Sequence, residues 1–499
     1  MGKIKKLLVA NRGEIALRIM RTAREMNIAT VAVFSEADRK SPHVRFADEA
    51  ICIGPPPSSQ SYLDADKIIA VCKQVRADAI HPGYGFLSEN AAFARKVKEA
   101  GLIFIGPPEE AIDVMGSKLA AKNIAAEQNV PLVPGTQSAI TDIEEAKQKA
   151  DEIGYPILIK ASAGGGGKGM RIVDNESEFE EQMARATSEA QSAFGDGSVF
   201  IEKYILSPRH IEIQILGDQQ GNVVYLFERE CSIQRRHQKV IEEAPSSILT
   251  PEVRKAMGEC AVTLAKACGY YNAGTVEFIV DENLKFYFLE MNTRLQVEHP
   301  VTEQITGLDL VRLQIEIAEG KPLSVRQEDL KILGHSMEVR VYAEDPKNNF
   351  LPDIGKLMTY QKPQGPGVRV DDGFEEGMEV PIYYDPMLAK LITTASTRNE
   401  AIDRMIRAIE EFRIIGVETT LPFCKYVMEH PNFKDGNFDT NFIKNHFTPE
   451  QLGGKFNEAE AKIAAWLAVK IFMGKEKTTA NNTTSSSNKS SKWKNRLHQ

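Results

Sequence analysis

Two apolar segments that lie close together constrain most strongly how this chain of 499 residues folds. Residues 275–280 (TVEFIV) and 286–292 (FYFLEMN) are rich in β-branched and aromatic residues, and the Asp-Glu-Asn stretch between them is typical of a turn. The two segments therefore predict a β-hairpin. Because its flanks are so apolar, each charged side chain on it needs a physical explanation.

Each strand of this predicted hairpin carries an acidic residue. In the register that pairs Val280 with Lys285, Glu277 lies opposite Phe288. Glu290 is then diagonal to Glu277, so the two carboxylates share one face. Carboxylates on an apolar face repel each other unless a cation lies between them, and oxygen ligands select a hard ion such as Mg²⁺. We therefore predict a metal site, against the alternative of an exposed sheet face with scattered acids. Its ligands are Glu277, Glu290 and Asn292.

The segment after the hairpin carries polar side chains at alternate positions. Arg294, Gln296 and Glu298 are separated by apolar residues, and alternate residues of an extended segment point to one side. We therefore expect a cation, an amide and an acid to enter one cleft. His299 precedes a proline and points away from that cleft, which favours a structural role.

A run of glycines marks a second candidate site. It follows the apolar strand predicted over residues 156–159 and Lys160. Glycine amides approach a ligand closely and can point several N–H groups at phosphate oxygens, so the run predicts a flexible flap over a polyphosphate. The Walker and G-x-G-x-x-G patterns are absent, and a plain flexible hairpin is the alternative. The glycines are Gly164, Gly165, Gly166 and Gly167.

Other cations lie near these motifs. Lys160 ends a strand and Lys118 begins a predicted helix, so both ammonium groups can meet anionic oxygens, although solvated lysines are the alternative. Residues 230–239 (ECSIQRRHQK) group two arginines, a histidine and a lysine just after a predicted strand. Taken alone, that cluster fits a solvated loop equally well.

Strand and helix patterns divide the chain into domains of α/β and α+β type. Residues 6–10, 14–26 and 30–34 follow the rhythm of a βαβ unit, which predicts a doubly wound N-terminal domain. A small α+β segment and a β-rich stretch follow, and Gly-Pro turns mark a third domain. The predicted boundaries are 1–115, 116–330 with a lid at about 132–204, 335–447, a helical extension at 448–474, and a disordered Ser/Asn-rich tail at 475–499.

Composition excludes several classes of protein. The chain has 61 Lys and Arg against 69 Asp and Glu, a net charge of −8. Its overall charge therefore does not indicate a protein that attracts nucleic acids. No run approaches the roughly 18 apolar residues of a membrane span, and the apolar run near the N-terminus is too short for a signal peptide. The six cysteines contain no C-x-x-C pair, so reduced thiols in a cytoplasmic protein are expected rather than a disulfide scaffold.

Taken together, these motifs resemble the biotin carboxylase family of the ATP-grasp superfamily, from about Lys3 to about Phe447. The resemblance implies a doubly wound N-terminal domain, a central ATP-grasp domain with a mobile lid, and a C-terminal biotin carboxylase domain. The matching motifs are VANRGEIA at 9–16, HPGYGFLSEN at 81–90, the glycine run, ECSIQRRHQK at 230–239, EMNTRLQVEH at 290–299 and EVR at 338–340.

The resemblance also implies roles for individual residues. ATP would bind with Mg²⁺ or Mn²⁺, and biotin would be a carrier-bound substrate. The implied ATP-binding residues are Lys118, Lys160, Gly164 to Gly167, Glu202, Lys203, Tyr204, Ile205, His210, Gln234, His237, Glu277 and Glu290. The implied bicarbonate and biotin site is Lys239, Arg294, Gln296, Val297, Arg340 and Tyr84, with Glu298 as general base and Lys239, Arg294 and Arg340 also catalytic.

The implied reaction activates bicarbonate through carboxyphosphate, the first half-reaction of an acyl-CoA carboxylase. No Met-Lys-Met biotin attachment site occurs, so the resemblance implies a separate biotin carboxyl carrier protein, carboxyltransferase subunits and a homodimer. Two alternatives stay open: an ATP-grasp ligase of the carbamoyl phosphate synthetase kind, and an inactive nucleotide-binding subunit. The sequence leaves open the final carboxyl acceptor, the oligomeric state and the role of the tail.

Overall fold

The computed structural model describes residues 2–136, 138–161, 170–194, 196–236, 238–453, 462–463, 465–467 and 469–470. The chain forms two compact units, Met1–Phe447 and Thr448–Gln499. In the second unit, a 3-10 helix spans Pro449–Leu452, and the described residues between 462 and 470 are helical. The helical extension predicted at 448–474 stays a prediction, and the predicted disordered tail lies outside the described residues.

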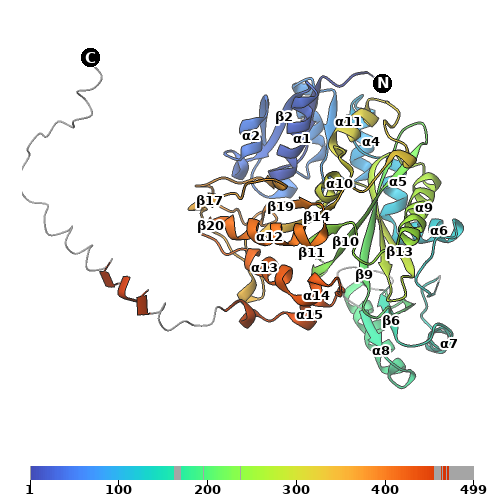
Figure 1. Ribbon diagram of the computed structural model, residues 1–499. Helices are drawn as coiled ribbons and strands as arrows, with labels where there is room; N and C mark the ends of the chain where they lie inside the picture. Colours follow the sequence, from blue (N-terminus) through green and yellow to red (C-terminus); the bar gives the residue numbers. More distant parts are fainter. Residues whose placement is uncertain are drawn as a thin grey trace, which may run out of the picture. The chain divides into compact units, whose positions relative to one another are not determined.

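The first strands of the chain form a five-stranded parallel sheet of order β3-β2-β1-β4-β5. This part of the chain is blue in Figure 1. Alternate residues of β1 enter different cores: Leu7 packs with α1 and with α11 (Leu310–Ala318), whereas Leu8 packs with α3 and α4. Both faces of the sheet are covered, which confirms the doubly wound N-terminal domain. The elements are β1 (Lys6–Val9), α1 (Gly13–Glu25), β2 (Ala29–Ser35), α2 (Pro42–Phe46), β3 (Glu49–Gly54), α3 (Ala65–Gln74), β4 (Ala79–His81), α4 (Ala91–Glu99) and β5 (Ile103–Phe104).

An eight-stranded antiparallel sheet of order β13-β12-β9-β10-β11-β14-β19-β18 carries most of the polar residues identified above. It continues across the predicted boundary at residues 330–335, because β11 pairs with β14. Domain limits there stay a prediction. The strands are β9 (Arg209–Gly217), β10 (Val223–Arg235), β11 (Gln238–Ala244), β12 (Asn272–Val280), β13 (Phe286–Asn292), β14 (His335–Tyr342), β18 (Val368–Asp372) and β19 (Met387–Ala395).

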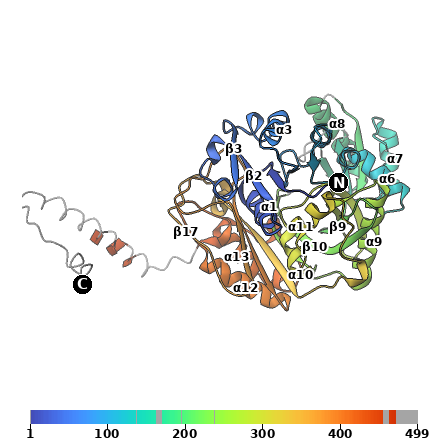
Figure 2. The same ribbon diagram turned by 90° about the horizontal axis from the view of Figure 1, so that it is seen from above.

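Helices and short strands flank this sheet. Helix α9 packs on β9 and β10, and α12 packs on β14 and β19. Helices α12 and α13 lie side by side (Figure 2). The elements are α5 (Glu109–Gly116), α6 (Lys118–Glu127), α9 (Pro251–Ala267), α10 (His299–Thr306), α11 (Leu310–Ala318), β15 (Glu344–Asp345), β16 (Leu351–Pro352), β17 (Thr359–Gln361), α12 (Arg398–Glu411), β20 (Arg413–Ile415), α13 (Leu421–Glu429), α14 (Pro431–Lys434) and α15 (Phe442–His446).

The β12–β13 hairpin exists, but the predicted register is wrong. Val280 pairs with Phe286 rather than Lys285, because Asp281 accepts the backbone N–H groups of Asn283 and Lys285 and so draws Lys285 into the turn. A β-bulge after Glu277 shifts the register again, so Glu277 lies directly opposite Glu290. The two carboxylates are therefore closer neighbours than the sequence predicted.

Two polar segments also differ from the sequence-based expectations. Residues 230–239 are not a solvated loop: they end β10 and begin β11, and the turn between those strands includes Arg236. Residues 293–298 form an irregular segment with a turn at Val297 and Glu298 rather than an extended strand. Burial of their ion pairs, described below, explains why charged residues occupy a sheet here.

A small three-stranded sheet lies within the predicted lid. Its order is β7-β6-β8, and the lid helices pack on it through apolar residues such as Ile159, Phe179 and Ile201. The N–H of Phe288 on the hairpin donates to the carbonyl of Pro131, which ties the start of this segment to the central sheet. The elements are α7 (Ile143–Ile153), β6 (Ile157–Ala161), β7 (Met170–Val173), α8 (Phe179–Phe194) and β8 (Val199–Lys203). Within the described residues, none of the helices has the length and hydropathy of a membrane span.

Candidate functional site

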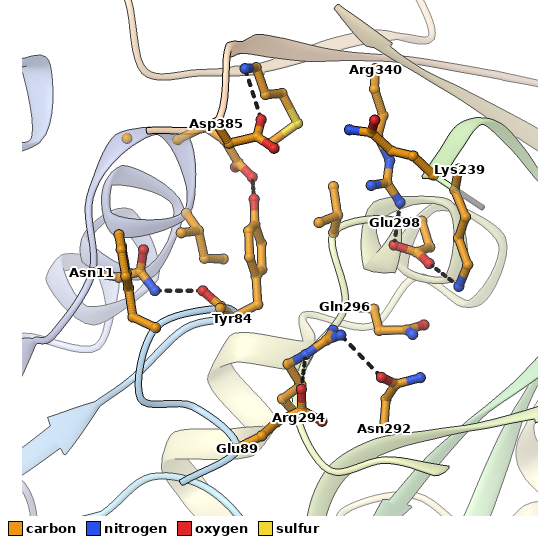
Figure 3. A pocket seen from close by; sticks show the side chains of 18 of the residues that line it. Asn11, Tyr84, Glu89, Lys239, Asn292, Arg294, Gln296, Glu298, Arg340 and Asp385 are labelled. Carbon is orange, nitrogen blue, oxygen red and sulfur yellow. Dashed lines mark hydrogen bonds and ion pairs between the residues drawn. The ribbon is translucent and has the colours of Figure 1, made fainter. Parts of the chain in front are cut away.

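A cavity of about 970 Å³ gathers most of the predicted site residues. The large sheet and the 292–298 segment contribute most of these residues, and the N-terminal domain contributes Tyr84 (Figure 3). The predicted residues that line it are Tyr84, His210, Gln234, Lys239, Glu277, Glu290, Asn292, Arg294, Gln296, Val297, Glu298 and Arg340.

Lys239 is the centre of this cavity's charge network. Its ammonium group donates to Glu212, to Glu277 at 2.8 Å and to Glu298 at 2.8 Å. Burial lowers the pKa of Lys239, but the three carboxylates outweigh burial and raise the pKa well above its usual value. One buried cation therefore holds three acids from three different elements.

Glu298 is shared between two cations. Its second carboxylate oxygen accepts from Arg340 at 2.9 Å, and Arg340 also donates to Glu242 at 2.7 Å. Burial raises the pKa of Glu298, but Lys239 and Arg340 outweigh burial and hold the pKa well below its usual value. Glu298 is thus ionised at neutral pH, as a general base must be.

Arg229 lies beneath the cavity and has no exposed surface. Its guanidinium donates to Glu212 at 2.5 Å, Gln214 at 2.7 Å and Gln296 at 2.9 Å, and to two threonine hydroxyls. All five N–H donors of the guanidinium are thereby directed at a partner, so Arg229 fixes Gln296 and Glu212 from below.

The predicted metal ligands are neighbours on the β12–β13 hairpin, and their role as ligands stays a prediction. Glu277 and Glu290 are cross-strand neighbours, and the amide of Asn292 donates to Glu277 at 2.9 Å. Burial and the charge of Glu277 raise the pKa of Glu290. Among the described residues, none donates a hydrogen bond to Glu290, which leaves its oxygens available. Glu277 already contacts Lys239 and His210, so a divalent cation bound between the two carboxylates would compete with these groups for Glu277.

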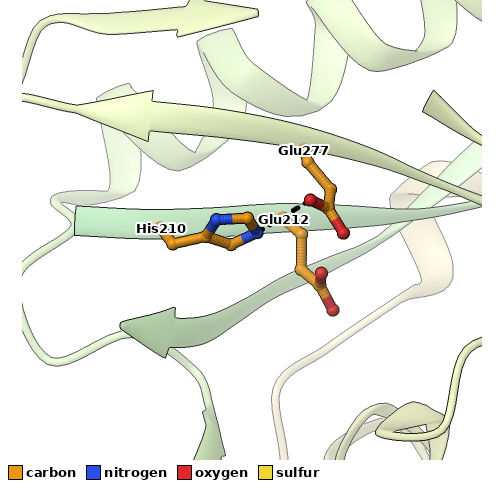
Figure 4. A group of neighbouring side chains, drawn as sticks. All are labelled: His210, Glu212 and Glu277. Carbon is orange, nitrogen blue, oxygen red and sulfur yellow. Dashed lines mark ion pairs between the residues drawn. The ribbon is translucent and has the colours of Figure 1, made fainter. Parts of the chain in front are cut away.

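A second acidic group nearby is less suited to a metal. His210, Glu212 and Glu277 converge from β9 and β12 (Figure 4), with His210 Nε2 2.9 Å from Glu277 Oε2. Lys239 already lies against both glutamates. Because an ammonium group neutralises these acids, a metal ion would have to displace it.

Arg294 and Tyr84 both line the cavity (Figure 3). Arg294 donates to Glu89 at 2.8 Å and to the Asn292 oxygen at 3.0 Å. The Tyr84 hydroxyl donates to Glu14, and the Asn11 amide donates to the Tyr84 carbonyl at 2.8 Å. Glu89 and Glu14 hold these two side chains in place.

The predicted phosphate-binding lysines lie elsewhere. Lys118 lines a smaller hollow of about 370 Å³ together with Glu290 and Asn292. Lys160 pairs with buried Glu202, which also binds Lys122. Burial raises the pKa of Glu202, but these two lysines outweigh it and lower the pKa.

Five further predicted ATP-binding residues are not brought to the large cavity, and five others lie outside the described residues. Lys203 donates to the carbonyls of Gly154 and Tyr155, both at 2.9 Å. The residues that line neither hollow are Lys160, Glu202, Lys203, Tyr204 and Ile205. The residues outside the described part are Gly164, Gly165, Gly166, Gly167 and His237.

Sequence reasoning missed Glu212, Arg229 and Glu242, which hold the residues that it identified. The sequence does contain a signal for Glu212. Residues 209–217 (RHIEIQILG) alternate polar and apolar side chains, which places His210, Glu212 and Gln214 on one face. No comparable pattern singles out Arg229.

This arrangement suits transfer chemistry on an anion. A carboxylate that stays ionised lies between two cations, with a third cation, Arg294, in the same cavity and two facing carboxylates on the adjoining hairpin. Fixed positive charges of this kind bind an anionic nucleophile and stabilise charge that develops on a phosphoryl group.

Family models and known proteins match most of this chain. Family models described as "Biotin carboxylase, N-terminal domain", "Carbamoyl-phosphate synthase L chain, ATP binding domain" and "Biotin carboxylase C-terminal domain" match residues 3–112, 117–326 and 338–445. Biotin carboxylase 1 of Bacillus subtilis is 53% identical over 444 residues, which cover 89% of this chain and 99% of that protein.

Longer relatives match as well. The propionyl-CoA carboxylase alpha chain of Ruegeria pomeroyi is 53% identical over 469 residues, 90% of this chain and 69% of the relative. The mitochondrial methylcrotonoyl-CoA carboxylase subunit alpha of Rattus norvegicus is 52% identical, with 89% of this chain and 62% of the relative covered. The chain therefore spans between 62% and 69% of these two alpha chains.

Solved structures share the fold. The biotin carboxylase of Campylobacter jejuni in a β-γ-ATP complex has a TM-score of 0.83 at 49% identity, covering 89% of this chain and 99% of the other. The biotin carboxylase domain dimer of Hydrogenobacter thermophilus 2-oxoglutarate carboxylase, with MgADP and bicarbonate, also scores 0.83 at 49% identity, covering 91% and 99%. The domain matches, the identities and the shared three-domain architecture lead to one conclusion: this chain belongs to the biotin carboxylase family.

Proposed function

We propose that this chain catalyses the ATP- and bicarbonate-dependent carboxylation of biotin, with the cavity around Glu298 as its active site. The observation that carries the proposal is the pairing of Glu298 with Lys239 and Arg340, because it sets an ionised base between two cations in one pocket. ATP-dependent carboxylation of biotin is the activity for which the family is named.

Bicarbonate is a weak nucleophile that must be aligned and lose its remaining proton. In our proposal, Arg294 and Lys239 bind its oxygens, Gln296 and Val297 orient it, and Glu298 takes the proton. The lowered pKa of Glu298 makes the free carboxylate a weak base. Glu298 becomes a stronger base when the substrate anion draws Lys239 away from it, because the loss of the neighbouring cation raises the pKa of Glu298.

Attack of bicarbonate on the γ-phosphorus of ATP forms carboxyphosphate and releases ADP. Mg²⁺ held by Glu277, Glu290 and Asn292 would neutralise charge on the phosphate oxygens. Lys118 lies in the hollow beside Glu290 and is placed to bind phosphate oxygens. Lys160 must leave Glu202 before it can do so.

Carboxyphosphate then breaks down to CO₂ and phosphate, and a phosphate oxygen removes the N1′ proton of biotin. Arg340 stabilises the enolate oxygen of the ureido ring, and N1′ attacks CO₂. Arg340 is suited to this role because Glu242 and Glu298 fix its guanidinium plane at the cavity wall. Tyr84 lines the same cavity.

We propose that the biotin is carried by a separate biotin carboxyl carrier protein and that carboxyltransferase subunits use the product. The acyl-CoA carboxylases among the relatives support an acyl-CoA as final acceptor, and the dimeric biotin carboxylase domain among the solved structures supports a homodimer. All six cysteines are free, which supports a reducing, cytoplasmic location.

The test is ADP release from MgATP in the presence of bicarbonate and free biotin. We expect turnover that depends on both compounds and falls by about 10²–10⁴-fold in Glu298→Gln. Glu303→Gln is the matched control, because Glu303 is also buried and paired with two arginines, Arg18 and Arg369, but lies outside the cavity. ADP release that biotin does not stimulate would favour a ligase of the carbamoyl phosphate kind, whose ATP-binding domain model also matches this chain. Absence of ATP turnover in the folded protein would favour an inactive subunit.

A further inference from the structure

Lys390 is a charged residue in an unexpected place. It lies in the middle of β19, in the apolar sequence MLAKLI, and its side chain has no exposed surface. It does not line the cavity, and the proposed mechanism gives it no role. A fully buried ammonium group is costly unless it has partners, so the partners indicate its purpose.

The ammonium group of Lys390 reaches two other parts of the chain. It donates to the backbone carbonyl of Val297 at 2.8 Å and lies 3.2 Å from Glu14 Oε1. Val297 belongs to the turn between Gln296 and Glu298, and Glu14 begins α1 in the N-terminal domain. One side chain of the C-terminal domain thus contacts both of the other domains at the cavity wall.

Asp371 does not compete for this lysine. It faces Lys390 from the neighbouring strand, but the nearest oxygen is 3.9 Å away. Arg369 already binds both Asp371 oxygens, at 2.9 and 2.7 Å. The charge of Lys390 is therefore available for Glu14.

Glu14 in turn holds Tyr84. The Tyr84 hydroxyl donates to the same carboxylate oxygen that faces Lys390, and the other oxygen of Glu14 is buried without a partner. Lys390 is the only cation within ion-pair distance of Glu14 among the described residues. Without the lysine, a buried acid would be left with a tyrosine as its sole side-chain donor.

We propose that Lys390 is a positioning residue that holds the 296–298 turn and Tyr84 together across the three domains, and so shapes the part of the cavity that takes bicarbonate and biotin. It acts through Val297 and Glu14 rather than by touching a substrate. This inference rests on the proposed function for its substrates, but the contacts that carry it are independent of that function.

The experiment compares Lys390→Met with Lys362→Met. Lys362 is a matched control because it pairs with Asp372 at 3.0 Å on the same strand as Asp371, yet does not reach the cavity. In Lys390→Met we expect the KM for bicarbonate and for free biotin to rise at least fivefold, with the KM for MgATP within twofold of the wild-type value. Lys362→Met should leave all three unchanged.

Amide hydrogen exchange gives a second readout that needs no turnover. Lys390→Met should speed exchange in residues 293–298 and 81–88, whereas Lys362→Met should not. If the wild type shows no biotin-dependent turnover, the proposed function fails, and the exchange experiment still decides the role of Lys390.

A double variant separates positioning from folding. Lys390→Met/Glu14→Gln removes the unpaired acid as well as the lysine, so it should recover thermal stability while the carbonyl of Val297 stays unbound and both KM values stay high. If Lys390→Met does not fold, the same measurements on Glu14→Gln decide the question, because this variant keeps the lysine and weakens its hold on Tyr84. Unchanged KM values and exchange, or a fall in kcat with all three KM values unchanged, would overturn the proposal.

Discussion

Replacement of Arg229 by methionine tests the buried charge network most directly. Arg229 has no exposed surface and donates to five side chains, including a charge-assisted bond of 2.5 Å to Glu212. Methionine keeps much of the length but has no donor, so Arg229→Met leaves the acceptors of Glu212, Gln214 and Gln296 buried with fewer partners.

The expected cost follows from these contacts. Removal of one partner from a buried ion pair costs about 3–5 kcal/mol. Glu212 keeps its bond to Lys239, so we expect the lower half of that range, about 3–4 kcal/mol. This corresponds to a fall in the folded-to-unfolded ratio on the order of a hundredfold or more. Gln296 also loses its anchor, so the KM for bicarbonate should rise in protein that remains folded.

The assay is urea denaturation followed by circular dichroism, with ADP release measured in parallel. Arg254→Met is the matched control, because Arg254 binds buried Glu228 on the same strand through two bonds of 2.7 and 2.8 Å but lies outside the cavity. It should lower stability and leave the KM for bicarbonate unchanged. The reasoning is refuted if Arg229→Met unfolds at the wild-type urea concentration, or if both variants change the KM equally.

Three further predictions concern other parts of the site. Gly373→Ala should destabilise the chain by about 1–3 kcal/mol in thermal unfolding, because an added Cβ would lie 2.8 Å from the backbone nitrogen of Glu14. Asp38→Asn should lower the unfolding free energy by about 3 kcal/mol at pH 7. Burial raises the pKa of Asp38, but its arginine partner outweighs burial and lowers the pKa, so this loss should shrink as the pH falls below about 4, and denaturation at pH 7 and pH 3.5 checks the sign. Glu290→Gln should raise the Mg²⁺ concentration for half-maximal ADP release at least about tenfold, since it removes a carboxylate opposite Glu277; an unchanged Mg²⁺ titration would contradict the metal site.

Much of the site was predictable because its residues follow local patterns. Twelve of the predicted residues line one cavity. Arg294, Gln296 and Glu298 all line it even though their segment is irregular rather than extended. Element types were also predictable where apolar periodicity was strong, as in β12, β13 and the N-terminal βαβ unit.

The errors have local and non-local causes. The hairpin register failed because the Asp281 side chain binds two backbone N–H groups of the turn and a bulge follows Glu277, and neither feature has a period that a pattern can reveal. Residues 230–239 fitted a solvated loop as well as a binding site, because the ion-pair partners of their charges lie far away in the sequence. Arg235 pairs with Glu344, and Lys239 pairs with Glu298.

Residue identities alone determined which side chains this chain can offer: an apolar hairpin with two acids, a set of cations near it, and strands long enough to bury them. Tertiary structure decided which charges meet. Lys239 binds Glu212, Glu277 and Glu298, which are 27, 38 and 59 residues away in the sequence. The physical reason is that secondary structure depends on periodicity over a few residues, whereas the ionisation and position of a buried charge depend on whichever partners the folded chain brings within about 3–4 Å of it.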